Sequence, residues 1–359
     1  MFGLFVTMWG KCWAAERYLR GWCVHGSALT RWKMPADPKI LEKIMNVYSG
    51  FLDPRLKAHP RAVAIGVFDG IHLGHQKIIR SMLRDAKRLG ISSAIVTFHP
   101  HPEHVLGRHG PDSSVLLSLH HRLALLKATG VQECIVVRFN RAFSKVSAEN
   151  FLNKFLLGRL RMRSLSVGKG FRFGRQARGD EHFLKESANR EGFLFHCIQP
   201  LRRRGEIVSS TRIRRLILSC RFSEASILLG RPYAIEGTVV AGRGRGRRIG
   251  FPTANLDPHH EVLPPSGVYA ASGKLKGKSR NAVVHIGSRP TFSDREKTVE
   301  IHFLNPTADI YGQDIELEFK GRLRSVKRFK SVEDLKAAIA QDIHKALKLF
   351  KLPIKTRPV

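Results

Sequence analysis

The sequence predicts an α/β protein of two domains, a Rossmann-like parallel sheet flanked by helices and then a small antiparallel β-barrel. Two observations predict this fold. Before about residue 230, short apolar runs alternate with longer helical stretches, and after it short alternating strands are separated by Gly, Pro and Asn turns. The 359 residues are 43% hydrophobic, enough for two cores, since a domain usually holds roughly 100 to 200 residues.

We divide the chain into four segments. Residues 1–44 form an extension that we expect to be poorly ordered, because aromatics are mixed there with Lys and Arg and acids are rare. A transit-type leader is the alternative, although no cleavage signal is evident. The first domain covers residues 45–230, the second covers 231–350, and 351–359 form a C-terminal tail.

Strands alternate with helices in the first domain. Residues 62–68 are typical of a buried strand, and 74–90 predict a helix that ends at a glycine. The alternation implies a parallel sheet with right-handed crossovers, and such sheets bind ligands at the carboxyl ends of their strands. The later units are a strand at 92–98, a helix at 119–130 before a strand at 133–139, and a helix at 148–160 before a strand at 164–169.

Short strands with alternating polarity define the second domain. A helix from about Ser331 to Phe350 has an apolar face and closes this domain. The pattern is typical of a small antiparallel barrel, with a sandwich as the alternative. The expected strands lie at 237–240, 267–275, 281–287, 298–304 and 314–323.

Charge and cysteine content limit the function classes. Lys and Arg total 62 against 29 for Asp and Glu, a net charge of +33 that favours anionic partners such as nucleotides, nucleic acid or acidic lipid headgroups. The five cysteines form no CxxC pair, which argues against a disulfide framework or a thiolate zinc site and favours the cytoplasm. No apolar run approaches the roughly 20 residues of a membrane helix, so we expect no membrane partner.

The stretch IGVFDGIHLGH (65–75) places two imidazoles where a strand turns into a helix. A helix N-terminus has unpaired N–H groups and the positive end of a dipole, so it attracts phosphate. His72 and His75 could donate to oxygens that gain charge during phosphoryl chemistry. The alternative is that the histidines only pack against or solvate the helix start.

A second anion-binding segment lies downstream in VSSTRIR (208–214). Ser209, Ser210 and Thr211 are typical helix caps with hydroxyl donors, and Arg212 and Arg214 can fork onto phosphate oxygens. Alone it would indicate an ordinary capped basic helix. Together the two segments predict a nucleotidyl-transfer site.

The sequence resembles the bacterial bifunctional riboflavin kinase/FMN adenylyltransferase family, also called FAD synthetase. The resemblance covers about residues 45–350 and rests on nine segments in order: GVFDGIHLGHQ, TFHPHP, FRFG, VSSTRIR, GRRIGFPTANL, GVYA, IGSRPTF, VEIHFL and YG. It implies that riboflavin and ATP give FMN in the second domain, and that FMN and ATP give FAD and pyrophosphate in the first. ATP would be the co-substrate and Mg²⁺ the cofactor.

For the first domain, the resemblance implies that His72 and His75 are catalytic and contact the ATP phosphates. It places the flavin beside the TFHPHP and FRFG segments. A separate zinc site of His99, His101, His104 and His109 is disfavoured, because prolines make the spacing irregular. The implied ATP-binding residues are Gly66, Phe68, Asp69, Gly74, Ser209, Ser210, Thr211 and Arg214, and the implied flavin-binding residues are Pro100, His101, Pro102 and Phe171.

For the second domain, the resemblance makes Thr253 and Asn255 ligands of Mg²⁺ and Glu300 the base that takes a proton from the ribityl 5′-hydroxyl. Gly250 and Pro252 would bind ATP. Without the resemblance, Glu300 is an outward-facing polar residue of a strand, and Gly250 and Pro252 are turn residues. GRGRGRR (242–248) either covers the nucleotide phosphates or is a solvated basic loop.

Several positions depart from the family pattern, most of them in the kinase half. They leave two other hypotheses open: a chain that retains only adenylyl transfer, and a basic nucleic-acid-binding protein. The Arg-Gly tract lacks the aromatics expected for single strands, so we expect no specific nucleic-acid partner. The sequence does not fix the oligomeric state. The departures are Gly170, His285, Asn305, Pro306 and Val326.

Overall fold

A computed structural model describes residues 45–107, 115–241, 245–259, 262–275, 278–288, 297–305 and 310–350. The predicted extension at 1–44 and tail at 351–359 lie outside these residues. The N-terminal half contains β1 (Asn46–Tyr48), β2 (Arg61–Ile65), α1 (Leu73–Leu89), β3 (Ser92–His99), α2 (Pro102–Val105), α3 (Leu119–Lys127), β4 (Glu133–Arg138), η2 (Phe143–Lys145), α4 (Ala148–Asn150), η3 (Phe151–Arg159), β5 (Met162–Gly168), η4 (Arg175–Ala177), α5 (Glu181–Glu191) and β6 (Leu194–Ile198).

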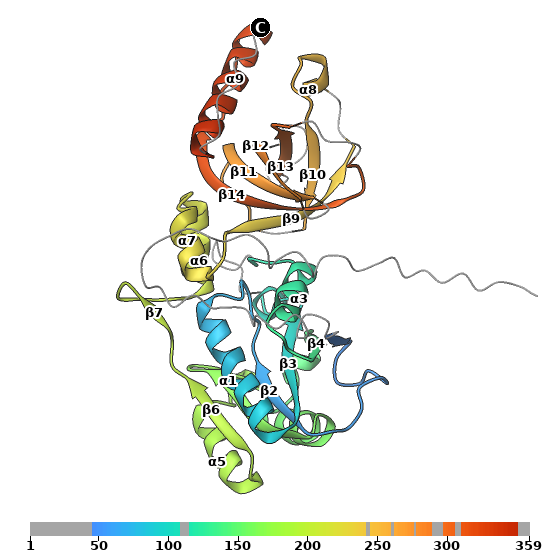
Figure 1. Ribbon diagram of the computed structural model, residues 1–359. Coiled ribbons are helices and arrows are strands. Elements are labelled where there is room, and N and C mark those ends of the chain that lie inside the picture. The colour runs from blue at the N-terminus through green and yellow to red at the C-terminus, as the bar shows by residue number, and fades with distance from the viewer. Residues whose placement is uncertain are drawn as a thin grey trace, which may run out of the picture.

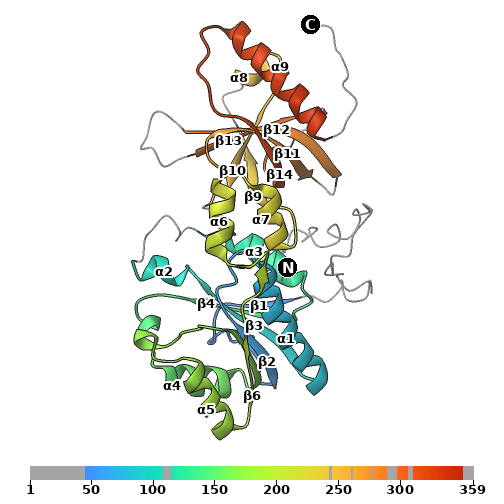
Figure 2. The same ribbon diagram turned by 90° about the vertical axis from the view of Figure 1, so that its left-hand side faces the viewer.

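The predicted parallel sheet is confirmed. Its six strands lie in the order β1-β4-β3-β2-β5-β6, and every neighbouring pair is parallel. Ala62 and Ala64 of β2 pack toward α1 and α3, whereas Val63 and Ile65 pack toward η3 and α5. Helices therefore cover both faces, as Figure 2 shows, which explains why the strands are apolar throughout.

The boundaries of the first strand and helix differ slightly from the prediction. The strand predicted at 62–68 ends earlier, at Ile65, because the backbone turns at Phe68, whose φ is +53°. The helix begins at Leu73 with His72 as its N-cap and ends at Gly90, whose φ is +63°. The helix predicted at 148–160 is a short α-helical turn, α4, continued by the π-helical η3.

The second half is a closed antiparallel barrel with the strand order β10-β13-β12-β11-β14-β9, so the barrel prediction is confirmed over the sandwich. Closure leaves no open sheet edge. The remaining elements are β7 (Arg202–Arg203), β8 (Glu206–Ile207), α6 (Ser210–Leu218), α7 (Phe222–Leu229), β9 (Ala234–Val240), α8 (Arg245–Arg248), β10 (Ala254–Pro258), β11 (Gly267–Leu275), β12 (Lys278–Ser288), β13 (Lys297–Phe303), β14 (Asp314–Arg324) and α9 (Val332–Leu349).

One hydrophobic cluster joins the two halves. The barrel sits at one end of the parallel-sheet domain, with α6 and α7 between them (Figure 1). Phe222 of α7 is buried and stacks on Tyr233, with 5.8 Å between ring centroids, and it also meets Phe319 at 5.4 Å. The same cluster contains Ile79 of α1 and Val299 of β13. The core is therefore continuous from the first helix to the barrel.

This continuity predicts that Phe222→Ala destabilises both halves together. Loss of a buried phenylalanine costs about 3 to 5 kcal/mol of unfolding free energy. We expect one thermal transition shifted to lower temperature, measured by calorimetry. Leu52→Ala is the control, since Leu52 is 84% exposed. Two separate transitions, only one of them shifted, would contradict a shared core.

Candidate functional site

The turn between β2 and α1 carries the two predicted histidines side by side. His72 is the N-cap of α1, and its Nδ1 accepts a hydrogen bond from the His75 backbone N–H at 3.2 Å. This contact requires Nδ1 to be unprotonated, which leaves Nε2 as the nitrogen that carries the proton. The two rings are stacked, with centroids 3.7 Å apart.

Three residues of this turn have a left-handed backbone. The φ angles of Phe68, Gly70 and Ile71 are +53°, +85° and +40°. Such conformations are costly for side chains other than glycine and persist only where the surroundings hold them. The Phe68 ring is fully buried and meets His75 edge-on, so its contribution to the predicted ATP site is to shape the turn.

The VSSTRIR segment lies against the same turn, although more than 130 residues separate the two. Ser210 Oγ donates to the Asp69 carbonyl at 2.7 Å, and the Arg214 guanidinium donates to the Asp69 carboxylate at 2.6 Å. Ser209 caps α6 by accepting from the Arg212 N–H at 3.3 Å. The two segments that together predict a nucleotidyl-transfer site are therefore in contact, since the starts of α1 and α6 meet at Asp69.

Asp69 and Arg214 are both buried and bound to each other, which refines the predicted role of the arginine. The other Asp69 oxygen accepts from the Leu116 N–H at 2.8 Å. Arg214 therefore fixes the turn in place with one side of its guanidinium, and its buried Nε has no partner among the described residues. Thr211 lies one residue into α6 and is partly buried.

The histidines are neutral at physiological pH. Burial lowers the pKa of His72 to about 4, and the nearby positive charge of Arg231 adds to this effect. Burial and the adjacent His72 hold the pKa of His75 well below its usual range. Neutral imidazoles donate a single N–H each, so the positive field of the site comes from the helix N-termini and the arginines.

The predicted flavin residues flank the turn on both sides. β3 and β5 are the neighbours of β2, and the carboxyl ends of parallel strands lie at one edge of the sheet. The residues Pro100, His101 and Pro102 follow β3, where His101 caps α2 by accepting from the Glu103 N–H. Phe171 follows β5 and stacks on Phe173, with 5.6 Å between centroids.

Within the barrel, the predicted metal ligand and base lie directly opposite each other. Asn255 of β10 pairs in register with Glu300 of β13, which in turn pairs with His285 of β12. His285 Nδ1 lies 3.8 Å from Glu300 Oε2. His285 is one of the departures from the family pattern, and it therefore contacts the predicted base. Burial lowers the pKa of His285. Thr253 immediately precedes β10.

The Arg-Gly tract approaches this second site. A Cβ placed on Gly246 in α8 would lie 3.0 Å from Thr253 Oγ1 and would overlap the Phe251 carbonyl. Pro252 is held by a 2.8 Å hydrogen bond between its carbonyl and His302, and Gly250 has a φ of +87°. Gly246 of the tract therefore lies against the GFPTAN segment.

Arg122 is a residue of this region that the sequence patterns did not indicate. This arginine of α3 is buried and donates to the carbonyls of Val67 at 2.8 Å and Phe98 at 3.2 Å, so it ties the ends of β2 and β3 together. Its position in the sequence could have indicated it, because Arg122 precedes Leu125 and Leu126 by one helical turn and shares their buried face. A cation on an apolar helix face indicates a buried polar partner.

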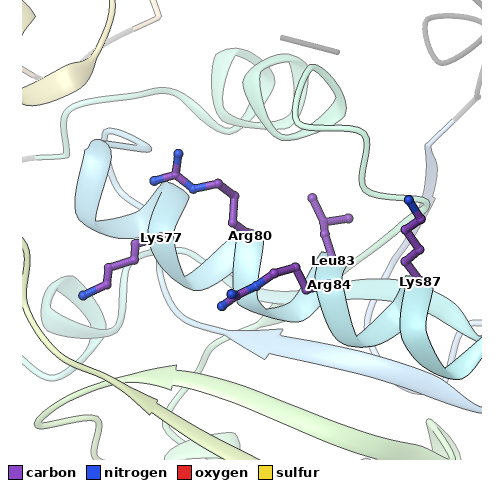
Figure 3. A pocket seen from close by; sticks show the side chains of 5 residues that line it. All are labelled: Lys77, Arg80, Leu83, Arg84 and Lys87. Atoms are coloured by element: carbon purple, nitrogen blue, oxygen red, sulfur yellow. The ribbon is translucent and has the colours of Figure 1, made fainter. Parts of the chain in front are cut away.

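A separate hollow of about 480 Å³ lies along the outer side of α1 and contains none of the predicted site residues (Figure 3). Its cationic lining shows that part of the excess positive charge lies on this helix beyond its first turn. The described residues contain no group of three or more His, Cys, Asp or Glu that could hold a metal. Of the four histidines considered for zinc, His109 lies outside the described residues. The hollow is lined by Lys77, Arg80, Leu83, Arg84 and Lys87.

Comparison with known proteins identifies both halves. Residues 55–212 match the FAD synthetase family and residues 229–350 match the riboflavin kinase family. The bifunctional riboflavin kinase/FMN adenylyltransferase of Bacillus subtilis is 32% identical over 80% of this chain and 92% of its own length. The protein of the same description from Haemophilus influenzae is 35% identical over 80% of this chain and 94% of its own length.

A solved structure has the same overall fold. A crystal structure described as a macrolide-efflux protein from Streptococcus pneumoniae has a TM-score of 0.74 and 28% identity, and the match covers 84% of this chain and 98% of that one. That description applies to the Streptococcus protein. In the part of this chain that the structure describes, no helix has the length and apolar character needed to cross a bilayer.

The left-handed turn predicts a large effect of Gly70→Ala on stability. A Cβ there would lie 2.8 Å from Leu116 Cδ1 and would occupy a left-handed conformation, so we expect a loss of about 2 to 4 kcal/mol. Gly90→Ala is the matched control: its φ is also positive, but a Cβ would meet nothing within 4 Å, so about 1 kcal/mol is expected. Urea unfolding measures both. Equal losses would mean that Leu116 does not confine the turn.

Proposed function

The chain belongs to the bifunctional riboflavin kinase/FMN adenylyltransferase family, and from this premise we propose which residues carry its two reactions. The enzyme phosphorylates riboflavin to FMN with ATP, and it adenylylates FMN to FAD with release of pyrophosphate. We assign adenylyl transfer to the turn at Asp69 and phosphorylation to the barrel surface around Glu300. The observation that carries the first assignment is the meeting of the α1 and α6 N-termini at Asp69.

In the adenylyl transfer, a phosphate oxygen of FMN attacks the α-phosphorus of ATP, and the bond to the leaving pyrophosphate breaks. Negative charge increases on the oxygens around the α-phosphorus and on the leaving group. Backbone N–H groups of the two helix starts and the Nε2–H of His72 are the donors suited to that charge. His75 stacks on His72 and holds its ring in place.

In the phosphorylation, the ribityl 5′-hydroxyl attacks the γ-phosphorus of ATP and ADP leaves. Glu300 takes the hydroxyl proton, which makes the oxygen a better nucleophile. Glu300 is partly exposed on its strand and can therefore reach a ligand on the barrel surface. Its cross-strand neighbour Asn255 places the metal ligand next to the base.

Mg²⁺ fits the donors of this second site. Thr253 supplies a hydroxyl oxygen and Asn255 an amide oxygen, the hard ligands that Mg²⁺ takes when substrate phosphates and water complete its shell. When bound, the ion neutralises charge on the phosphates. We also infer a cytoplasmic location, supported by Cys134, Cys197 and Cys220, which are free thiols.

His72→Asn tests the adenylyl-transfer site. Asn is a good helix N-cap, so the cap is kept while the imidazole is lost. We expect FAD formation from FMN to slow by about 10²- to 10³-fold, the usual cost of removing one preorganised donor. Riboflavin phosphorylation should stay unchanged, as should both reactions in the exposed control His182→Asn. Chromatographic separation of the flavins over time measures both rates, and unchanged FAD formation would remove His72 from the site.

Glu300→Gln tests the phosphorylation site by removing the base while keeping the shape. FMN formation from riboflavin should slow by about 10²- to 10⁴-fold, whereas FAD formation from added FMN should be unaffected. Glu333→Gln on the exposed start of α9 is the control. Wild-type kinase activity in the Glu300 variant would assign the base to another residue.

A further inference from the structure

The joint between the two domains (residues 229–231) packs directly on the turn between β2 and α1 that we assign to phosphate binding. Gln76 of α1 donates to the carbonyls of Leu229 at 3.1 Å and of Ile71 at 3.0 Å, which links the joint to the turn. Gly230 has a φ of +73°, and a Cβ there would lie 2.6 Å from Leu73 Cδ2. Leu73 is the first residue of α1, so the joint lies against the helix start that faces the phosphates.

Arg231 makes a direct polar contact across this joint. Its guanidinium donates to the Gly70 carbonyl at 2.9 Å and to the Ile71 carbonyl at 3.4 Å. Gly70 and Ile71 both have positive φ angles, and such a backbone needs support from its surroundings. A planar guanidinium with donors at fixed spacing matches two successive carbonyls, whereas an ammonium group does not.

We propose that Arg231 is a positioning residue for adenylyl transfer: it holds the Gly70–Ile71 carbonyls so that His72 and the N-terminus of α1 face the ATP phosphates. The inference rests on the proposed assignment of that turn to the adenylyl-transfer site. It means that the kinase half of the chain, which begins before Arg231, supplies part of the support for the other active site.

Arg231 also acts on the charge of the histidines. His72 accepts the His75 N–H through Nδ1 only while it is neutral, so protonation breaks the cap of α1. A nearby cation opposes that protonation and extends the neutral state to lower pH. Without it, the pKa of His72 rises, and the cap is lost at a higher pH as the solution is acidified. The charged groups that act on the two histidines are Arg231, Arg214 of α6 and Arg122 of α3. Asp69 of the same turn is paired with Arg214 and interacts with His101 and Arg122.

Two variants of the full-length chain separate position from charge. Arg231→Lys keeps the positive charge but loses the planar pair of N–H donors, and Arg231→Met loses both the charge and the donors. We expect kcat for FAD formation from FMN to fall by about 10- to 100-fold in both, the usual cost of a misplaced catalytic group. Only Arg231→Met should also move the acid-side fall of FAD formation to higher pH, followed from about pH 3.5 to 7 so that the range includes the wild-type pKa of His72 of about 4.

Phosphorylation of riboflavin by the same protein is the internal control, because Gly70 and Ile71, which accept the Arg231 hydrogen bonds described above, are not assigned to that reaction. It should keep its wild-type kcat and KM in both variants. Arg221→Met is the matched control near the joint, since Arg221 is exposed and, among the described residues, its guanidinium pairs with Glu224 in the first turn of α7. Both reactions should remain at wild-type rates in this control.

Three results would overturn the inference. FAD formation at the wild-type rate in Arg231→Met would remove the residue from the site. An equal fall of both reactions in both variants would show that Arg231 supports the whole fold rather than one site. An unshifted acid limb in Arg231→Met would remove its effect on His72. Failure of the underlying assignment is distinct, because His72→Asn would then form FAD normally whatever the Arg231 variants do.

Discussion

The buried ion pair between Asp69 and Arg214 is the constraint on which the first site depends. It joins the turn after β2 to a helix 145 residues later, and both side chains are almost inaccessible to solvent. Burying two charges is costly, and such a pair is tolerated where hydrogen bonds satisfy it, as the Leu116 N–H does for Asp69. Together with the hydrogen bond from Ser210 to the Asp69 carbonyl, the pair joins the start of α6 to the turn that precedes α1.

Around this pair, buried arginines hold backbone carbonyls in place. Arg122 binds the ends of β2 and β3, and Arg231 binds the turn itself. Arg231 donates to the carbonyls of Gly70 and Ile71, which have left-handed backbones. Arg122 donates instead to Val67, just before the turn. The strain in the turn is thus offset by charged hydrogen bonds from outside it. Only part of the net charge of +33 lies near this turn, because the separate hollow along α1 is lined by Lys77, Arg80, Arg84 and Lys87.

The continuous core gives the two reactions a shared framework. Phe222 and Tyr233 belong to the same cluster as α1 and the barrel strands. The product of the kinase reaction is a substrate of the adenylyl transfer, so both activities in one chain serve one conversion. The joint at 229–231 therefore continues the core and also binds the turn around Asp69 and the start of α1.

The sequence by itself determined the fold class, because hydrophobic periodicity and turn residues are local properties of the chain. It also indicated His72, Ser209 and Glu300, since each stands in a recognisable segment. The tertiary structure alone decided that Arg214 binds Asp69, that His285 contacts Glu300, and that Arg122 and Arg231 hold the turn. These contacts join residues far apart in the chain, and no local pattern records which carbonyl or carboxylate a buried cation will meet.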